Sequence, residues 1–384
     1  MKKICFLTDS IFSIGGVQRV TAVIAKELAK DFDVTIVTFD KPDTKNTTLY
    51  GLEEANIHYR FLAYPPTPQW KVRCCKSYSY LFRKLLPQTR LTSDVYAHSS
   101  FPSEKRQALA KELLAGHYDV IIGVHAPLAV RLAACRKQLK GVRLIGWIHN
   151  SYEALFGTGS LYIGPELRKH YEYQLQKLDT TVVLCHDDAQ KYHFPTQVIY
   201  NPLTLTPGEP SKGNSKKFLA VGRFSRRHKG FDLLIDAFHL FAQNDKEWTL
   251  DIVGNGPEEE LYRRKIAEYH LESRVRLHPF TTDIQRYYSE AQVYVLSSRW
   301  EGFGLVLVEA MAHGLPVVSS DLPTSKEIMG DFGLYFENGN IEELADRLLE
   351  ATTLDWKKKS EEAFAIARRF DLGRIAEQWR NHGL

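Results

Sequence analysis

The sequence predicts an α/β protein made of two doubly wound, Rossmann-like domains. Short apolar runs alternate with segments of helical spacing along most of the 384 residues, which is typical of parallel sheets whose strands are joined by crossover helices. A stretch rich in Pro, Gly, Ser and Lys interrupts the alternation at residues 201–217, and the alternation then starts again. A chain of this length also exceeds what one ordinary core accommodates.

The first domain is expected to span residues 1–203. Its candidate strands are residues 2–9, 33–39, 119–125, 143–149 and 180–185. Between the first two strands, Val17, Val20, Ile24 and Leu28 recur at the spacing of one helix face. We interpret the N-terminal run as a buried strand, because its apolar part is too short for a signal peptide.

The second domain is expected to span residues 204–364, beyond the linker. Its strands and helices alternate strictly. The expected strands are 217–224, 248–254, 274–280 and 293–298, and the expected helices are 230–243, 257–270 and 282–291. Ligands of such sheets bind outside the carboxyl ends of the strands, so site residues are expected directly after each strand.

Composition narrows the function classes. Apolar residues make up 44% of the chain and charged residues 25%, as in soluble globular proteins. A net charge of +4 is too small to indicate nucleic acid as a partner, and no run of 18 apolar residues would span a membrane. We therefore expect a cytoplasmic protein. The five cysteines form no C-x-x-C pair, so we expect neither disulfides nor a zinc site.

Gly15 and Gly16 lie between the first expected strand and the first expected helix. Glycine at this place lets an anionic ligand approach the backbone near a helix N-terminus. A plain turn explains the two glycines equally well. The dinucleotide fingerprint G-x-G-x-x-G is absent here, which argues against a dehydrogenase.

Two cations follow the first strand of the second domain. Arg223 comes directly after the strand, and Lys229 precedes the next helix. Cations at the carboxyl end of a parallel strand suit a diphosphate. The alternative is a solvated basic loop, which a second anion-binding feature in the same domain would disfavour.

Residues 300–310, with the sequence WEGFGLVLVEA, are that second feature. Gly302 and Gly304 free the loop, and a helix beginning near Gly304 would point its first amides at a phosphate. Glu301 lies just outside this helix and Glu309 inside it. Five helical residues rise roughly 7.5 Å, so the acids would flank the phosphate-binding turn. A glycosidase instead directs its two acids at one bond, and the pattern therefore favours a nucleotide sugar as ligand.

These motifs resemble the retaining glycosyltransferases of family 4 (glycosyl transferases group 1), which have the GT-B fold. The signature is Glu301, seven residues, then Glu309, and GRFSRRHKGFDLLIDAF resembles the family's phosphate motif. DIVGNGPEEELYR resembles the following strand and helix, SIGGVQRV the glycine loop, and GWIHNS the segment with the active-site histidine. The resemblance covers nearly the whole chain and is weak at residues 51–116. It implies two Rossmann-like domains facing each other across a cleft.

The resemblance also implies a role for each domain and candidate residue. Residues 1–203 would bind the acceptor, with residues 365–384 packing back on them, and residues 204–364 would bind the donor. Arg223 and Lys229 would bind the donor diphosphate, Glu301 the transferred sugar, and His149 would lie near the anomeric carbon. The other donor contacts would be Gly15, Gly16, the amides of Phe303, Gly304 and Leu305, Glu309 at the ribose, and the backbone of 277–280 at the base. Without the resemblance, His149 would be an ordinary strand-end residue.

The resemblance further implies retention of anomeric configuration, with no metal and no cofactor besides the nucleotide sugar. Basic residues and helix amides would replace the cation, and the neighbouring acids Asp187 and Asp188 do not form a D-x-D triplet. The expected donor is a UDP-hexose or UDP-N-acetylhexosamine, with a GDP-sugar as the alternative. The sequence departs from the family at residues 321–329, which lack a glycine-rich turn, and at Cys185 and His186. These departures concern donor or acceptor details.

Residues 55–93 contain no acid and seven basic residues: Arg60, Lys71, Arg73, Lys76, Arg83, Lys84 and Arg90. On a helical wheel one face carries apolar side chains, namely Cys74, Tyr78, Leu81, Phe82, Leu85 and Leu86, and basic residues occupy the other face if the helix continues past Pro87. Residues 71–90 can therefore lie on an anionic membrane, or pack on the sheet with a solvated basic back. The first interpretation predicts peripheral attachment at the inner face of the cell membrane and a lipid-linked saccharide acceptor, in surface polysaccharide or glycolipid synthesis.

Other interpretations compete with this one. The acceptor could be a small sugar or a protein side chain. Another enzyme class on the same fold, a phosphorylase or a sugar-nucleotide epimerase, is disfavoured because the chain is short and shows no pyridoxal site. A non-catalytic carbohydrate-binding relative would have lost the acids or the cations, and Arg223, Lys229, Glu301 and Glu309 are all present.

Overall fold

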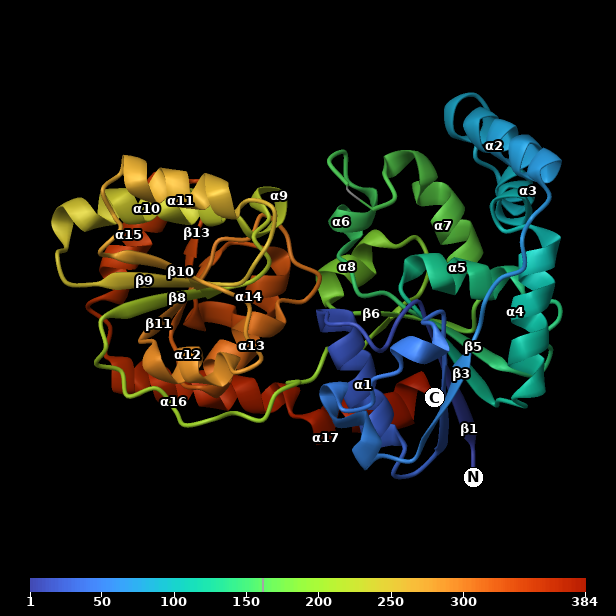
Figure 1. Ribbon diagram of the computed structural model, residues 1–384, viewed down its shortest axis with the longest axis horizontal. Helices are drawn as coiled ribbons and strands as arrows, with labels where there is room; N and C mark the ends of the chain where they lie inside the picture. The colour runs from blue at the N-terminus through green and yellow to red at the C-terminus, as the bar shows by residue number, and fades with distance from the viewer. Residues whose placement is uncertain (161) are drawn as a thin grey trace. The chain divides into compact units, whose positions relative to one another are not determined.

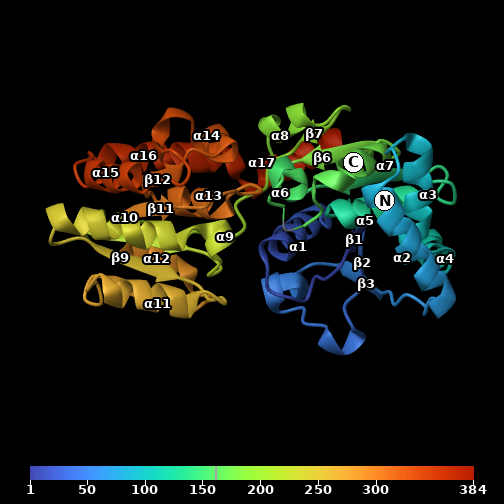
Figure 2. The same cartoon turned by 90° about the horizontal axis from the view of Figure 1, so that it is seen from above.

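The computed structural model describes residues 1–160 and 162–384. It divides into two compact units, one formed by residues 1–202 together with 372–384 and the other by residues 203–371. Each unit has its own parallel sheet with helices around it (Figures 1 and 2). The two Rossmann-like domains predicted from the sequence are therefore confirmed.

The first unit contains a seven-stranded sheet with the strand order β3-β2-β1-β4-β5-β6-β7. Its strands are β1 (Lys3–Thr8), β2 (Asp33–Thr38), β3 (Ile57–Phe61), β4 (Val120–Val124), β5 (Arg143–Trp147), β6 (Thr180–Val183) and β7 (Gln197–Val198). Its helices are α1 (Gly16–Leu28), α2 (Gln69–Lys84), α3 (Arg90–Ser100), α4 (Ser103–Ala115), α5 (Ala126–Ala134), α6 (Tyr152–Phe156), α7 (Arg168–Leu175), α8 (His186–Lys191) and α17 (Leu372–Gln378). Every residue of β4 is buried, as expected for a central parallel strand covered on both faces.

The second unit contains a six-stranded sheet with the order β10-β9-β8-β11-β12-β13. Its strands are β8 (Lys217–Val221), β9 (Thr249–Val253), β10 (Val275–His278), β11 (Val293–Leu296), β12 (Val317–Ser320) and β13 (Leu334–Phe336). Its helices are α9 (Arg226–Lys229), α10 (Phe231–Asn244), α11 (Glu259–Glu268), α12 (Ile284–Glu290), α13 (Leu305–Ala312), α14 (Pro323–Met329), α15 (Ile341–Ala351) and α16 (Trp356–Ala367).

The strand order reverses direction once in each sheet, between β1 and β4 and between β8 and β11. Right-handed crossovers then place the helices before and after the reversal on opposite faces, for example α1 and α5 in the first unit. At such a point the loops after the two strands diverge and leave room for a ligand at the carboxyl edge. The fold therefore directs attention to the residues that follow β1, β4, β8 and β11.

The C-terminal residues 372–384 belong to the first unit. Helix α17 packs against α1, and Arg380 pairs with Asp31, with nitrogen and oxygen 2.6 Å apart. The return to the first unit begins at residue 372 and not at residue 365, because α16 packs against α13 and stays with the second unit. The chain first passes from one unit to the other between residues 202 and 203.

The predicted long basic helix is a pair of helices. Helix α2 ends at Lys84, Pro87 lies in the connection, and α3 begins at Arg90. Proline lacks the backbone N–H and clashes with the preceding turn, which ends the helix here. Within the described residues, no helix is both long and apolar enough to cross a membrane.

Candidate functional site

In the second unit, the residues after β8 and those after β11 lie at the same edge of neighbouring strands. The ammonium Nζ of Lys229 lies 2.5 Å from Oε1 of Glu301. The Oγ of Ser298 donates a hydrogen bond of 2.6 Å to the same oxygen, and Nε2 of His228 lies 3.7 Å away from it. The side chains of Lys229 and Glu301 are only 11% and 8% exposed, so the sequence-predicted cation and acid form one buried ion pair.

The backbone between α9 and α10 holds this pair in place. Gly230 has φ 61°, and a Cβ there would lie 2.1 Å from the carbonyl oxygen of Ser297. Only glycine combines this conformation with such a close approach. The hydroxyl of Ser297 donates to the carbonyl of Lys229 at 2.9 Å, and the amide of Arg299 donates to the carbonyl of His228 at 2.7 Å. The loops after β8 and β11 are thereby fastened together.

Glu301 is ionised in this setting. Burial alone would favour the neutral acid, but the Lys229 ammonium and the His228 ring outweigh it and hold the pKa of Glu301 well below its ordinary value. The ring of His228 stacks on Trp300 with centroids 3.7 Å apart and planes 5° apart. No sequence pattern pointed to Ser298, His228 or Trp300, because their contacts depend on how the two loops pack together.

The other cations of the loop after β8 differ in availability. Arg223 is exposed and makes no ion pair within the described part of the chain. Arg226 pairs with Asp232 at 3.1 Å, and Asp232 also accepts from Arg299 at 3.0 Å. Arg223 can therefore turn to an anion, whereas Arg226 is already engaged.

Helix α13 begins directly after the glycine that the sequence predicted. Gly304 has φ 85° at the N-cap, where a side chain would be strained, and Leu305 is the first helical residue. Glu309 lies inside the helix and is 2% exposed. The hydroxyl of the buried Tyr288 donates a hydrogen bond of 2.9 Å to its Oε2. The two predicted acids thus lie on either side of the helix start, and Tyr288 is a partner that sequence reasoning missed.

In the first unit, the loop between β1 and α1 is fixed by two distant side chains. The carboxylate of Asp40 accepts hydrogen bonds from the amides of Ile11 and Phe12, at 2.8 and 3.2 Å. The amide of Gly15 donates to the hydroxyl of Tyr50 at 2.9 Å. Of the two predicted glycines, Gly15 therefore already donates its amide to a side chain, and Gly16 is the first residue of α1.

His149 follows β5 and lies deep in the first unit. It is 7% exposed, and its Nε2 has no hydrogen-bond partner among the residues that the structure describes. Burial, and to a lesser degree the neighbouring His125, hold the pKa of His149 well below its ordinary value, so the ring is neutral at neutral pH. A neutral imidazole with an unsatisfied buried nitrogen can exchange a hydrogen bond with a ligand.

His125 is a second histidine at this edge that sequence reasoning missed. It follows β4, and its ring centroid lies 5.4 Å from that of His149. Its backbone has φ 76° and ψ 150°, a region that is costly for any residue other than glycine. The amide of His125 donates to the carbonyl of Trp147 at 2.8 Å, and this bond helps to hold the conformation.

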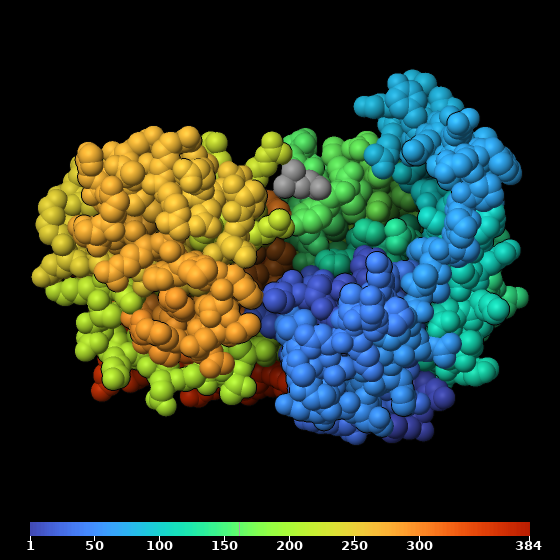
Figure 3. Space-filling view, viewed as in Figure 1, coloured from blue at the N-terminus to red at the C-terminus, as the bar shows by residue number. Residues whose placement is uncertain are grey.

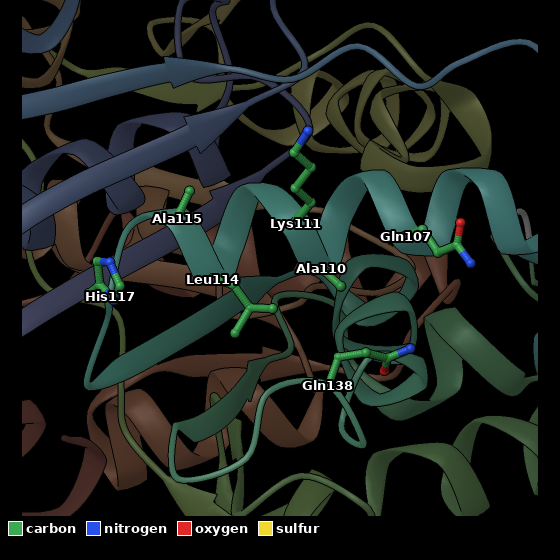
Figure 4. A pocket seen from close by; sticks show the side chains of 7 residues that line it. All are labelled: Gln107, Ala110, Lys111, Leu114, Ala115, His117 and Gln138. Carbon is green, nitrogen blue, oxygen red and sulfur yellow. The ribbon is translucent and has the colours of Figure 1, made fainter.

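A shallow hollow of the first unit lies elsewhere, on α4 (Figure 4). It is lined by Gln107, Ala110, Lys111, Leu114, Ala115, His117 and Gln138. None of these residues belongs to the predicted site.

The described residues contain no group of three or more His, Cys, Asp or Glu side chains placed to hold a metal ion. The chain has one D-x-D triplet, Asp31–Phe32–Asp33, at the amino end of β2. Asp31 pairs there with Arg380, and Asp33 lies 3.8 Å from Lys3. Within the first sheet, this triplet lies at the opposite end of the strands from Gly15 and His149.

Two Rossmann-like units and an acid–cation pair beside a glycine-started helix define a GT-B glycosyltransferase. The family described as glycosyl transferases group 1 matches residues 205–369, and the family described as glycosyltransferase family 4 matches residues 14–206. The chain belongs to glycosyltransferase family 4.

Relatives and solved structures agree with this assignment. An uncharacterised glycosyltransferase of Haemophilus influenzae is 28% identical over 99% of both chains. The amylovoran biosynthesis glycosyltransferase AmsD of Erwinia amylovora is 30% identical over 87% of this chain and 85% of its own. Anabaena HepE in complex with UDP has a similar fold, with a TM-score of 0.74, 22% identity and coverage of 99% and 98%. Staphylococcus aureus TarM in complex with UDP and saccharides gives a TM-score of 0.73, 17% identity and 99% coverage of both chains.

Proposed function

We propose that this glycosyltransferase moves a hexose or N-acetylhexosamine from a UDP-sugar to a saccharide acceptor with retention of configuration and without a metal or cofactor. The observation that carries the proposal is the buried Lys229–Glu301 pair at the carboxyl edge of the second sheet. Because the cation and the acid are in contact, the cation can bind the diphosphate of a donor while the acid binds the sugar hydroxyls of the same donor. The exposed Arg223 adds a second positive charge.

The proposed chemistry breaks the bond between the anomeric carbon and the diphosphate oxygen and joins that carbon to an acceptor hydroxyl oxygen. Negative charge grows on the departing diphosphate, where Lys229 and Arg223 would stabilise it. Glu301 would accept hydrogen bonds from the transferred sugar, and Glu309 from the ribose. His149 would exchange a hydrogen bond through its free Nε2 near the anomeric carbon.

The preference for a UDP-sugar is supported by solved structures of the same fold. Anabaena HepE was solved with UDP-glucose, and S. aureus TarM with UDP. A thermal-shift comparison of UDP, GDP and ADP tests the base. Stabilisation by UDP above the other two is expected, and preferential stabilisation by GDP would overturn this part.

Retention and metal independence are tested together. The enzyme is incubated with nucleotide sugars and an acceptor in excess chelator, and the anomeric proton of the product is followed by NMR. We expect unchanged turnover and an α-linked product from an α-linked donor. Loss of activity that manganese restores, or an inverted product, contradicts the proposal.

For the acceptor we propose a lipid-linked saccharide at the inner face of the cell membrane, in the synthesis of a surface polysaccharide or glycolipid. Relatives include the amylovoran enzyme AmsD and a lipopolysaccharide 1,6-galactosyltransferase of Salmonella typhimurium. Attachment would use residues 71–90 of the first unit. A protein acceptor is the second candidate, because a Streptococcus pneumoniae relative, 27% identical over 55% of this chain, is a peptide N-acetylglucosaminyltransferase subunit. Transfer assays with lipid-linked and peptide acceptors separate the two.

A further inference from the structure

The helices α2 and α3 of the first unit lie next to each other (Figure 1), and their facing side chains form a small apolar cluster with Leu167. Phe82 of α2 is 1% exposed and stacks on Tyr96 of α3 with centroids 4.4 Å apart. The hydroxyl of Tyr78 donates to the carbonyl of Thr92 at 3.1 Å. The apolar face predicted for this segment is therefore divided, and only Tyr78 and Phe82 turn toward the protein.

The rest of that face lies open at the surface (Figure 3, light blue). The structure exposes twelve large apolar side chains among its described residues, and seven of them fall between residues 70 and 95. They are Trp70, Tyr80, Leu81, Leu85, Leu86, Leu91 and Val95. Trp70 and Leu81 are three helical turns apart and share one side of α2, and Leu91 and Val95 share one side of α3. Soluble proteins rarely gather so many exposed apolar side chains without a binding partner.

Positive charge accompanies these side chains. Four of the seven basic residues in the segment are engaged, as Arg60 pairs with Glu112, Lys71 with Glu104, Arg83 with Glu166, and Arg90 donates to Gln176. The other three, Arg73, Lys76 and Lys84, are exposed and make no ion pair within the described chain. No acid lies between residues 55 and 93 to neutralise them.

We propose that this α2–α3 surface, made of the seven exposed apolar residues and the three unpaired cations, binds an anionic lipid bilayer. Trp70, Leu81, Leu85 and Leu91 would enter the boundary between headgroups and acyl chains, and the cations would face lipid phosphates. A bilayer is the partner that takes scattered apolar side chains and unpaired cations together without requiring a matched pocket. The inference deepens the proposed function, because it names the surface that brings the enzyme to a lipid-linked acceptor.

Flotation of the full chain with vesicles tests the surface without any sugar chemistry. The vesicles are phosphatidylcholine with or without phosphatidylglycerol. The charge variant replaces Arg73, Lys76 and Lys84 by Gln, and the apolar variant replaces Trp70, Leu85 and Leu91 by Ser. Matched controls are Lys111→Gln and Leu114→Ser, which change an exposed cation and an exposed leucine of α4.

The wild type is expected to float with the anionic vesicles and to keep part of this binding in high salt. The charge variant should bind about a hundredfold more weakly, since each basic residue near an anionic surface contributes about fivefold. The apolar variant should bind only at low salt, and the two controls should match the wild type. Thermal unfolding of all variants at the wild-type temperature shows that the fold is kept.

The proposal is overturned if the wild type stays out of the anionic vesicle fraction, or if the two variants float as well as the controls do. It is also overturned if the wild type is a dimer in solution that the apolar variant abolishes, because the surface would then bind a second copy. Transfer to a water-soluble saccharide is measured separately and should not change in either variant. Vesicle binding without any transfer would reject the proposed function and leave the surface assignment standing.

Discussion

Lys229 and Glu301 neutralise each other before any ligand is bound, and their roles cannot be separated at the scale of single residues. A buried carboxylate that loses its cation keeps the cost of desolvation without the compensating attraction. Each residue is therefore tied both to the stability of the second unit and to donor binding.

Replacing Lys229 by Ala should lower both activity and stability. We expect turnover to fall about a hundredfold or more, because the charge that grows on the leaving diphosphate loses a partner. Unfolding free energy should fall by about 3–5 kcal/mol, the usual cost of breaking a buried ion pair. Steady-state kinetics and urea unfolding measure the two effects.

The double variant Lys229→Ala with Glu301→Gln is the control. It should regain much of the lost stability, because no buried charge is left unpaired, while turnover stays low. A Lys229→Ala enzyme with full stability would show that the ion pair does not form in solution.

Glu301 should also determine part of the fall in unfolding free energy at acidic pH. Its pKa in the folded chain is held below the ordinary value of 4.5, so the stabilisation from its ionised form is complete above about pH 4.5 and is lost as the pH falls further. In Glu301→Gln this loss should disappear, and the unfolding free energy should depend less on pH between about 5 and 3. Equal slopes for the two proteins would contradict the ion pair.

The charged residues of the site and their order along the chain could be predicted from the sequence, but the residues that contact them could not. Lys229, Glu301 and Glu309 stand out because of their spacing around glycines. Ser298, Trp300 and Tyr288 carry no such pattern, and their contacts arise only when the loops after β8 and β11 and the helix α12 pack together. The predicted function of each site residue stays a prediction.

At the scale of elements, the C-terminal segment supports the candidate catalytic histidine. The ring of Trp379, which is fully buried, lies 4.8 Å from the ring of Trp147, and Trp147 lies 4.3 Å from His149. Trp147 is the last residue of β5 and so places the loop that carries His149. The packing of Trp379 against Trp147 can therefore affect the position of His149.

Trp379→Ala should destabilise the first unit by about 3–5 kcal/mol, the range found when a buried aromatic side chain is removed. It should also reduce turnover, because Trp147 can relax into the cavity and move His149. Phe at position 379 should restore most of both. If Trp379→Ala lowers stability but leaves turnover unchanged, the packing does not position the histidine.

The strands β3, β7, β12 and β13 were missed, and the other strands of the two sheets were predicted. Several predicted strands carry buried apolar runs, such as KICFLT in β1 and KFLAV in β8, which are visible in the sequence. The strand β3 is an edge strand whose IHYRF residues are mostly half-exposed, so its sequence is mixed. The strands β7 and β13 have only two and three residues, too few for a periodic signal.

At the scale of the whole molecule, the histidines with a lowered pKa are unevenly distributed between the two units. Five histidines have a lowered pKa, and four of them, His98, His125, His149 and His170, belong to the first unit. The fifth is His313 of the second unit. Burial is the main cause in every case, and it lowers the pKa of His170 to about 4.

The first unit should therefore be the more acid-sensitive one. Below about pH 6.5 the unfolded chain binds protons at these histidines that the folded chain does not, and stability falls as the pH falls. Asp188 acts in the opposite direction, since burial raises its pKa to about 6, but it is one group against four. Hydrogen exchange at pH 5.5 should show faster opening in β4 and β5 than in β8 and β9, and the reverse order would contradict this prediction.

The return of α17 to the first unit sets the order in which the two units can finish folding during synthesis. The first 202 residues leave the ribosome early but lack residues 372–384, which complete their unit. At about 5–20 residues per second, the remaining 182 residues (384 − 202) take roughly 10–40 s. Residues 203–371 contain all of the second unit, so the half of the protein that is translated later becomes whole first. Nascent chains stalled when residue 371 has emerged should carry a protease-resistant second unit beside a first unit that is still digested.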